Sequence, residues 1–337
     1  PRRSAAGAAA VVGGSAPGEA TRWGEHAVLY GDPAIVAAVQ LRAEARWGGD
    51  GDLARFPEAA AARRCAEAAA GAVRAGLSLD VSALRSGGHK LGVGSSAAGA
   101  AAAAAAVFAR RGASLAEAAV RARVFEAALA GHRAVAPEGS GADVAAAVFG
   151  GFVAFRRAAR APGAPVERAA LSAPAGLRFR VVWTGRAART SDFVARVRAL
   201  EAHDPTTFAR VMGELREGAT DFDAALRAGD AERTVAAAAA YGEAMARLGA
   251  AAGLPIVEDR LAHIAALAAE AGGAAKPSGA GGGDVAVAFF ASESAAQRFE
   301  RACATRPFAR SSAGAALTHP RIVDAALGGA GVAPLAG

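Results

Sequence analysis

Three glycine-rich loops, far apart along this chain of 337 residues, constrain its fold more than any other feature. They cover residues 86–94, 137–141 and 276–283, and the first two precede predicted helices while the third precedes a predicted strand. Glycine lets the backbone come close to a ligand or to another segment, because it carries no side chain. If these loops converge they can build one site, and the chain is long enough for a core in one large domain or two ordinary ones.

Alanine-rich stretches and runs of bulky apolar residues predict a mixture of helices and strands. Helices are predicted over residues 57–75, 97–111, 115–129, 144–149 and 293–305, and over most of 189–271 with breaks at 203–205, 229–230 and 253–255. Strands are predicted over residues 27–29, 34–46, 152–155, 179–184 and 285–290, the first two as a hairpin-like pair. Because these elements do not alternate as a regular βαβ repeat, we expect an α+β fold. The Pro/Ala-rich residues 158–166 mark the expected boundary between two halves.

The net charge of +7 comes almost entirely from arginines that are scattered singly among alanines and glutamates. This spacing favours a solvated surface over a tract for a polyanion, so we expect no nucleic-acid partner. We expect no membrane partner either, because the apolar run at residues 97–107 is mostly alanine and too short to span a bilayer. The N-terminus lacks the leucine-rich segment of a signal peptide. Cys65 and Cys303 form neither a metal pattern nor a disulfide framework, so a reducing cytoplasm is the expected location.

The chain contains only two lysines, Lys90 and Lys276, and each lies in or against a glycine-rich loop. Arginine serves almost everywhere else that a cation is needed. A compact ammonium acts as a point charge on phosphate, whereas the guanidinium group needs room for its planar fork. The placement of the two lysines therefore indicates phosphate-binding loops.

The central loop runs into a predicted helix, which favours an anion site. The first turn of a helix presents free N–H groups and the positive end of the helix dipole. Ser95 and Ser96 can donate hydrogen bonds to phosphate, and a hydroxyl there can also meet Mg²⁺. The alternative is a serine N-cap after a flexible turn. The loop is not a Walker A motif, because Lys90 precedes the glycines, and the spacing of the Rossmann fingerprint is missing.

The second and third loops also admit two interpretations each. In the second loop, Asp143 could accept a proton, orient an acceptor oxygen or help to hold a metal. Alternatively, Ser140 and Asp143 have the S-x-x-D spacing of a capping box. The third loop, Lys276-Pro277-Ser278-Gly279-Ala280-Gly281-Gly282-Gly283-Asp284, suits a backbone packed tightly against a ligand, or else a long flexible hairpin turn.

Together the loops resemble the three motifs of the GHMP kinases, a superfamily of small-molecule ATP kinases. The first motif is similar to Ala16-Pro17-Gly18 followed by Gly24-Glu25-His26, and then Pro33-Ala34. The second is Gly92-Val93-Gly94-Ser95-Ser96-Ala97-Ala98, and the third is Lys276 to Gly283. The motifs occur in the order of the family and frame residues 16–290.

Further details resemble the phosphomevalonate kinases within this superfamily. Lys90 lies just before the Gly-x-Gly-Ser-Ser run, and Gly139-Ser140-Gly141-Ala142-Asp143 is followed by Gly150-Gly151. Trp183-Thr184-Gly185 is similar to a Trp-Thr-Gly segment of those enzymes. The resemblance implies phosphorylation of 5-phosphomevalonate to 5-diphosphomevalonate in isoprenoid synthesis.

The resemblance also implies a two-domain fold and a set of site residues. The domains would be an N-terminal ATP-binding domain like ribosomal protein S5 domain 2 over residues 1–170, and a ferredoxin-like C-terminal domain over 171–337, with the active site between them. ATP would bind Lys90, Leu91, Gly92, Val93, Gly94, Ser95, Ser96 and Ala97, with Mg²⁺ at Ser96 and with Asp143 and Lys90 as catalytic residues. The phosphorylated substrate would bind Glu25, His26, Ser140, Gly141, Arg189, Lys276, Ser278, Gly279, Ala280 and Gly281. A homodimer is one assembly that this resemblance allows.

Two positions depart from the family pattern. Glu19 stands where the family usually has lysine, and His132 stands where mevalonate kinases carry a magnesium-binding glutamate. Other functions therefore stay open beside the first. One is a mevalonate kinase or another GHMP small-molecule kinase. Another is a non-catalytic pseudokinase, which Glu19 favours, or an RNA-binding protein that uses the S5-like fold and the basic charge.

Overall fold

The computed structural model describes residues 11–25, 27–48, 51–86, 89–137, 139–157, 166–188, 190–309 and 318–336. The α-helices in these ranges are α1 (Pro57–Ala70), α2 (Ser95–Arg110), α3 (Ala118–Val135), α4 (Ala142–Phe149), α5 (Thr190–His203), α6 (Pro205–Ala228), α7 (Ala231–Ala252), α8 (Asp259–Glu270) and α9 (Glu293–Thr305). The strands are β1 (Val11–Trp23), β2 (Ala34–Trp47), β3 (Leu77–Asp80), β4 (Arg85–Ser86), β5 (His89–Lys90), β6 (Phe152–Arg157), β7 (Val166–Leu171), β8 (Arg178–Trp183), β9 (Gly273–Pro277), β10 (Val285–Phe290), β11 (Arg321–Val323) and β12 (Ala333–Ala336). Two short 3₁₀ helices cover Ala27–Tyr30 and Ser82–Leu84.

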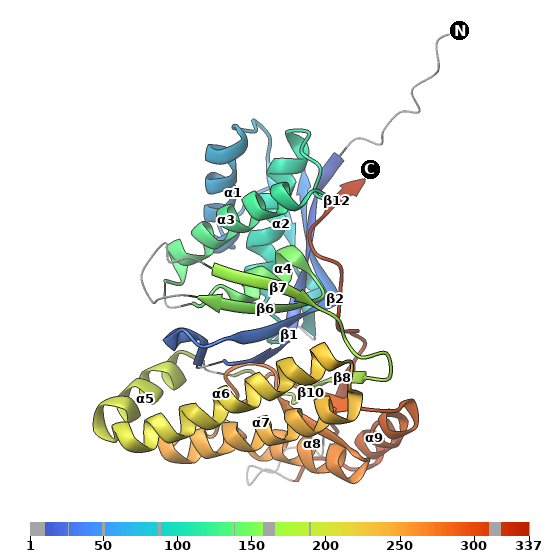
Figure 1. The fold of residues 1–337 in the computed structure, drawn as a ribbon. Coiled ribbons are helices and arrows are strands. Elements are labelled where there is room, and N and C mark those ends of the chain that lie inside the picture. Colours follow the sequence, from blue (N-terminus) through green and yellow to red (C-terminus); the bar gives the residue numbers. More distant parts are fainter. Residues whose placement is uncertain are drawn as a thin grey trace.

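The chain forms two joined parts, and each is built on an antiparallel sheet (Figure 1). In the upper part the strand order is β12-β1-β2-β6-β7, with β3 also paired to β2, and helices α1–α4 cover this sheet. In the lower part the order is β11-β8-β10-β9, with helices α5–α9 around it. This arrangement confirms the α+β fold.

Small residues bring α2 against β1 at backbone distance. Every residue of α2 from Ala97 to Ala109 is buried, and almost all of them are alanine or glycine. A Cβ added at Gly14 of β1 would lie 2.5 Å from the backbone nitrogen of Ala106 and 2.8 Å from the carbonyl oxygen of Ala102. Since no side chain fits between the two backbones, α2 lies directly on the strand that carries the first motif.

The long helical stretch is interrupted where the sequence predicts. Asp204 caps α6 by accepting a hydrogen bond from the Thr207 amide at 2.9 Å, and Asp230 caps α7 in the same way. Gly229 and Gly253 end α6 and α7 in the left-handed conformation, which glycine adopts without strain. The predicted breaks are therefore confirmed, and each has a local chemical cause.

An aromatic cluster joins the two parts. Trp23 at the end of β1 stacks on Phe222 of α6 with ring centroids 3.4 Å apart, and it also contacts Phe289 of β10. Phe179 of β8 contacts both Phe289 and Phe152 of β6, so the cluster runs from one sheet to the other. The two sheets thus share buried apolar packing.

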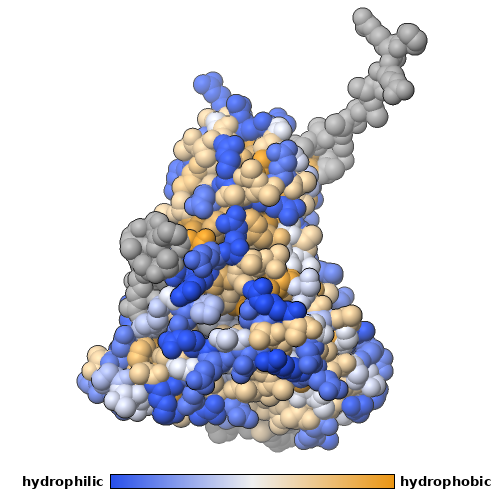
Figure 2. All heavy atoms as spheres, in the orientation of Figure 1, coloured by the Kyte–Doolittle hydropathy of each residue, from blue (hydrophilic) through white to orange (hydrophobic). Residues whose placement is uncertain are grey.

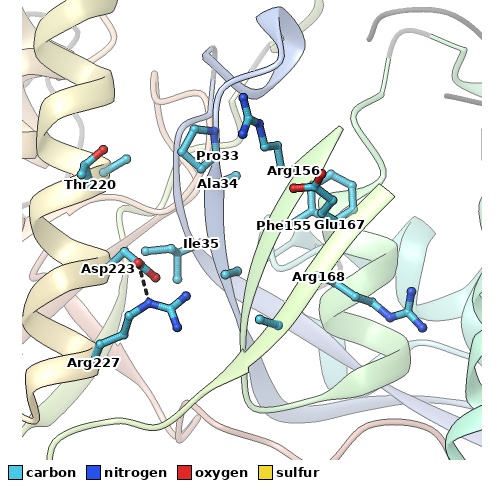
Figure 3. A pocket seen from close by; sticks show the side chains of 13 residues that line it. Pro33, Ala34, Ile35, Phe155, Arg156, Glu167, Arg168, Thr220, Asp223 and Arg227 are labelled. Carbon is cyan, nitrogen blue, oxygen red and sulfur yellow. Dashed lines mark hydrogen bonds and ion pairs between the residues drawn. The ribbon is translucent and has the colours of Figure 1, made fainter. Parts of the chain in front are cut away.

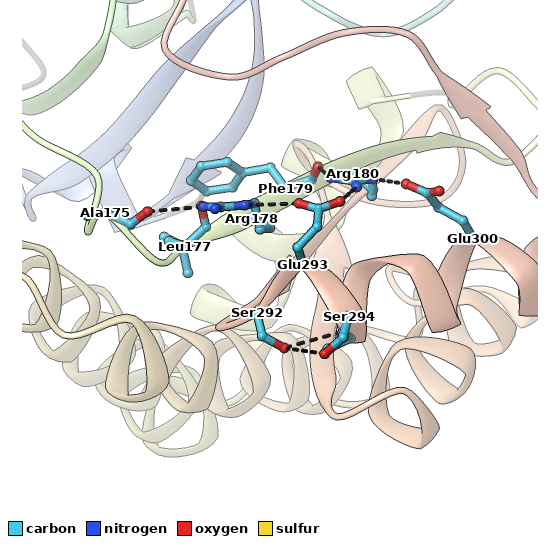
Figure 4. A network of polar contacts seen from close by, with 10 residues as sticks. Ala175, Leu177, Arg178, Phe179, Arg180, Ser292, Glu293, Ser294 and Glu300 are labelled. Carbon is cyan, nitrogen blue, oxygen red and sulfur yellow. Dashed lines mark hydrogen bonds and ion pairs between the residues drawn. The ribbon is translucent and has the colours of Figure 1, made fainter.

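Surface ion pairs fix α9 against the second sheet. Glu293 accepts hydrogen bonds from Arg178 and Arg180, each at 3.0 Å, and Arg180 also contacts Glu300 (Figure 4). On the face drawn in Figure 2, hydrophilic side chains are interspersed with apolar ones over both parts. Within the described part of the chain, no helix combines the length and the apolar character that crossing a membrane requires.

Two features of the fold differ from the predictions. The predicted strand at residues 27–29 is a 3₁₀ helix, and the partner of β2 in the hairpin is β1, which the sequence analysis did not predict. The proposed boundary at residues 170 and 171 stays a prediction. However, β7 ends at Leu171 within the first sheet, and β12, near the C-terminus, pairs with β1 of the same sheet.

Candidate functional site

The central loop enters α2 through two glycines in the left-handed region. Gly92 has φ 75° and Gly94, the N-cap of α2, has φ 70°. Among the residues that the structure describes, no side chain caps this helix end, and Ser95 and Ser96 lie in its first turn. The alternative of a serine N-cap is therefore wrong. The N–H groups of the first turn point out of the helix, which is the arrangement that an anion needs.

A cavity of about 290 Å³ opens beside this helix end. It lies between the first turns of α1 and α2, and Ser95, Ser96 and Lys90 line it. Its remaining lining residues are Arg55, Phe56, Pro57, Glu58, Ala59, Leu79, Val81, Arg85 and Gly99. Three cationic side chains and one carboxylate make this cavity net positive, which suits a polyphosphate. Arg55 and Arg85 were not predicted as site residues, because arginine is too common in this chain for either to stand out.

The first motif lies directly against the central loop. The Glu19 amide donates a hydrogen bond of 3.0 Å to the carbonyl oxygen of Val93. A Cβ added at Gly18 would be 2.3 Å from that same oxygen, so only glycine fits there. The Glu19 side chain passes beside Gly94, because a Cβ added at Gly94 would be 3.0 Å from Glu19 Cγ. A carboxylate side chain thus lies close to the N-terminus of α2. It belongs to Glu19, the position at which GHMP kinases usually have lysine.

The third loop reaches the central loop through Asp284. A Cβ added at Gly92 would lie 2.4 Å from Asp284 Cγ. Asp284 has φ 56°, and its Oδ1 accepts a hydrogen bond of 3.0 Å from the Ala188 amide. Burial raises the pKa of the Asp284 carboxyl above its ordinary value, although the Ala188 amide and the charge of Lys90 act in the opposite direction. Asp284 ends the glycine-rich motif in the sequence, and no sequence signal assigned it a role.

A buried ion pair joins the third loop to the first motif. Lys276 Nζ lies 2.8 Å from Glu25 Oε1, and the two side chains are 0% and 2% exposed. The Tyr241 hydroxyl donates to Glu25 Oε2 at 2.5 Å and accepts from the Gly24 amide at 2.6 Å. Burial raises the pKa of the Tyr241 phenol well above its ordinary value, and the Glu25 charge adds to the shift, so the hydroxyl stays protonated. Glu25 and Lys276, predicted as substrate ligands, thus contact each other.

The rest of the third loop divides into a fixed part and an open tip. Ser278 is buried, and its hydroxyl donates to the carbonyl oxygen of Ala20 in β1. A Cβ added at Gly281 would be 2.3 Å from the Ile256 carbonyl oxygen. By contrast, a Cβ added at Gly279 would meet no described atom within 4 Å, and Ala280 is half-buried. A ligand therefore has access to the tip, and the flexible-turn interpretation does not fit the packed remainder.

The second loop precedes α4, which packs on β1 and α2. Its N-cap is Gly141 instead of Ser140, and no side chain of the described residues makes the N-cap hydrogen bond, so the capping-box interpretation is wrong. The buried Ser140 hydroxyl accepts from the Ala142 amide at 3.2 Å. Asp143 Oδ1 accepts from the Val144 amide at 2.9 Å, and its Oδ2 lies 3.9 Å from His132 Nε2. Asp143 thus stays a candidate for contact with a substrate.

Two predicted substrate ligands, His26 and Arg189, lie outside the described residues. A second cavity, of about 320 Å³, lies between α6 and strands β2, β6 and β7 (Figure 3). Ile35, Phe155 and Asp223 are among the residues that line it, and the lining includes none of the predicted site residues. The predicted nucleotide ligands Lys90, Ser95 and Ser96 line the first cavity instead.

Known proteins share this fold and part of this sequence. Residues 224–309 match the family model for the C-terminal domain of GHMP kinases. A phosphomevalonate kinase from Streptomyces sp. (strain CL190) is 32% identical over 237 residues, which are 64% of this chain and 62% of that protein. Over these regions the chain is similar in sequence to GHMP kinases. The matched region spans less than two thirds of the length of that curated relative.

Solved structures show the same fold over almost the whole chain. A Lin0012 protein from Listeria innocua has a TM-score of 0.75 at 20% identity, and the match covers 93% of this chain and 99% of that one. A Streptococcus pneumoniae phosphomevalonate kinase in complex with phosphomevalonate and AMPPNP has a TM-score of 0.68 at 18% identity, covering 92% and 99%. The mevalonate kinase of L. major in complex with R-mevalonate has a TM-score of 0.67 at 22% identity, covering 95% and 97%. The two-domain GHMP kinase fold is thus confirmed.

Proposed function

We propose that this chain is an ATP-dependent kinase that phosphorylates 5-phosphomevalonate to 5-diphosphomevalonate. The observation that carries the proposal is the 32% identity over 237 residues to a phosphomevalonate kinase. The net positive cavity beside an uncapped helix N-terminus supports it, because this cavity suits the phosphates of ATP.

In this proposal the nucleotide phosphates bind at the first turn of α2. The N–H groups of that turn, the hydroxyls of Ser95 and Ser96, and the ammonium of Lys90 would hold them. Within the described residues, no group of three or more His, Cys, Asp or Glu side chains could hold a metal. Mg²⁺ in kinases is commonly held by few protein ligands together with substrate phosphates and water. Ser96 would supply one oxygen, and the ion would neutralise charge on the phosphates.

Phosphoryl transfer to a phosphate acceptor needs cations more than it needs a strong base. A phosphate monoester is largely ionised at neutral pH, because its second pKa is about 6. Two anionic groups must therefore approach each other, and catalysis comes mainly from positioning and charge neutralisation. Lys90 would balance this charge, with Arg189 as a further candidate. Asp143 would orient the acceptor oxygen from the N-terminus of α4.

A coupled assay of ADP release tests the proposal. Purified protein with Mg·ATP is offered phosphomevalonate, mevalonate, homoserine or galactose in separate reactions. We expect the highest kcat/KM with phosphomevalonate, and Ser96→Ala serves as the comparison with an impaired nucleotide site. A preference for mevalonate would replace the proposed acceptor. If the protein forms no ADP with any of these acceptors and binds RNA in a salt-sensitive way, the non-catalytic alternative holds instead.

A further inference from the structure

Three side chains from distant parts of the chain meet in one buried cluster. Glu25 follows β1, Tyr241 lies in the middle of α7, and Lys276 lies in β9 just before the third loop. The first two residues are 216 positions apart and the outer two are 251 apart. The cluster therefore joins the first motif, the third loop and the helical part of the molecule at one point.

Each of the three side chains makes at least one hydrogen bond to another member of the cluster. Lys276 Nζ donates to Glu25 Oε1 at 2.8 Å and to the Pro277 carbonyl oxygen at 2.6 Å. The same ammonium lies 4.9 Å from the ring centroid of Trp23 and 5.4 Å from that of Tyr241. Glu25 Oε2 accepts from the Tyr241 hydroxyl, as described above. Such a satisfied buried network is rigid, because any displacement leaves a buried charge without its partner.

This burial argues against direct contact with a ligand. The Lys276 and Glu25 side chains are 0% and 2% exposed, so a substrate could reach them only by breaking the cluster. The hydroxyl of the next loop residue, Ser278, donates to the Ala20 carbonyl oxygen and forms a second link between β1 and the start of the loop. The start of the loop is thus held at two successive positions, while the tip at Gly279 stays open.

We propose that Glu25, Tyr241 and Lys276 are positioning residues, which hold the third glycine loop against the first motif so that the loop tip can contact the phosphate acceptor. The acceptor part of this inference rests on the proposed kinase function, whereas the fixed loop does not. Displacing a substrate-positioning segment by about 1 Å can cost about a hundredfold in rate. The cluster therefore acts on the reaction through the backbone of residues 278–281.

The substitution Tyr241→Phe tests the role of the cluster with little change in shape. The ring stays in the core, but the Gly24 amide loses its acceptor and Glu25 loses a donor. The matched control is Tyr30→Phe, since the Tyr30 hydroxyl also donates to a glutamate, Glu201 of α5, at 2.8 Å. Glu25→Gln provides a second variant that keeps the shape of the side chain and removes its charge.

Two measurements distinguish an effect on the loop from an effect on the reaction. Hydrogen–deuterium exchange is followed on peptides that cover residues 277–284, in protein without substrates. Steady-state kinetics then give KM for the acceptor and KM for ATP. In Tyr241→Phe we expect faster exchange of the loop and a rise of about tenfold in acceptor KM, because the loop that contacts the acceptor is positioned less precisely. We expect a change of less than about twofold in KM for ATP, because Lys90, Ser95 and Ser96 lie outside the cluster.

These measurements distinguish a failure of the positioning role from a failure of the proposed kinase function. Unchanged loop exchange in both Tyr241→Phe and Glu25→Gln would overturn the positioning role whatever the enzyme does. If the wild-type protein releases ADP but the Tyr241 and Tyr30 variants change both KM values alike, the effect is general destabilisation and the inference also fails. If the wild-type protein uses no acceptor while loop exchange still rises in Tyr241→Phe, the fixed loop stands and the proposed kinase function fails.

Discussion

Removing the charge of Lys276 should lower the free energy of unfolding far more than removing a surface charge. The Lys276–Glu25 pair has an N–O distance of 2.8 Å, and its side chains are 0% and 2% exposed. In Lys276→Met the apolar stem is kept, but the Glu25 carboxylate is left buried without its cation. Breaking a buried pair in this way costs about 3–5 kcal/mol. Because the free energy of unfolding of a single domain is about 5–15 kcal/mol, this cost is a large part of it.

The double variant Glu25→Gln with Lys276→Met separates the cost of an unpaired charge from the cost of lost packing. Replacing a whole buried ion pair by neutral residues of similar volume is often close to neutral in stability. Glutamine also keeps an oxygen for the Tyr241 hydroxyl. We therefore expect the double variant to recover most of the stability that Lys276→Met loses.

Denaturation with urea, followed by circular dichroism, measures these differences. The control is Arg216→Met, which breaks the ion pair with Asp32 at a guanidinium that is 53% exposed. An exposed pair contributes about 0–1 kcal/mol, so this control should unfold nearly as the wild type does. If Lys276→Met is no less stable than Arg216→Met, or if the double variant is as unstable as the single one, an unpaired buried charge is not the cause of the destabilisation.

Four further substitutions test other parts of the structure. Gly131→Ala should destabilise by about 1–3 kcal/mol in thermal denaturation, because the new Cβ would lie 2.2 Å from the Ala62 nitrogen; a gain in stability would show that α1 and α3 are further apart. Burial raises the pKa of the Asp284 carboxyl in the folded state. Ionising this carboxyl therefore lowers the free energy of unfolding as the pH rises through that pKa. Asp284→Asn should therefore raise Tm at neutral pH, with a difference that shrinks in acid. Ser96→Ala should raise KM for Mg·ATP by about tenfold without lowering Tm. Asp143→Asn should lower kcat by about a hundredfold at unchanged Tm, because the acceptor oxygen loses the group that orients it. A fall in Tm alone would assign Asp143 a structural role.

Elements with local chemical signals could be predicted from the sequence. The breaks around Asp204, Gly229 and Gly253 depend on caps and left-handed glycines, which short stretches of sequence specify. Helix α9 was predicted with its observed bounds, Glu293–Thr305, and Ser292 caps it. The junction between the central loop and α2 could be predicted in the same way, because the loop and the helix are adjacent in the sequence.

Features that depend on distant partners could not be predicted. Strand β1 consists largely of glycine, alanine, serine and proline, which have low strand propensity, and only its pairing with β2 and β12 makes it a strand. The burial of Lys276 depends on Glu25, 251 positions away. A lysine beside a glycine loop therefore indicated a phosphate ligand, whereas the structure places its ammonium in the core. Tyr241 had no signal of its own beyond the rarity of tyrosine in this chain.

The small residues of this chain determine how closely the loops can approach. At Gly14 an added Cβ would lie 2.5 Å from the Ala106 nitrogen, so α2 rests on β1 without an intervening side chain. That contact places the N-terminus of α2 beside Gly18 and Glu19, which are residues of the same strand. A larger side chain at Gly14 would lift the helix and draw the central loop away from the first motif. The abundance of alanine and glycine in β1 and α2 is thus a geometric condition for a site built from loops that are far apart in the sequence.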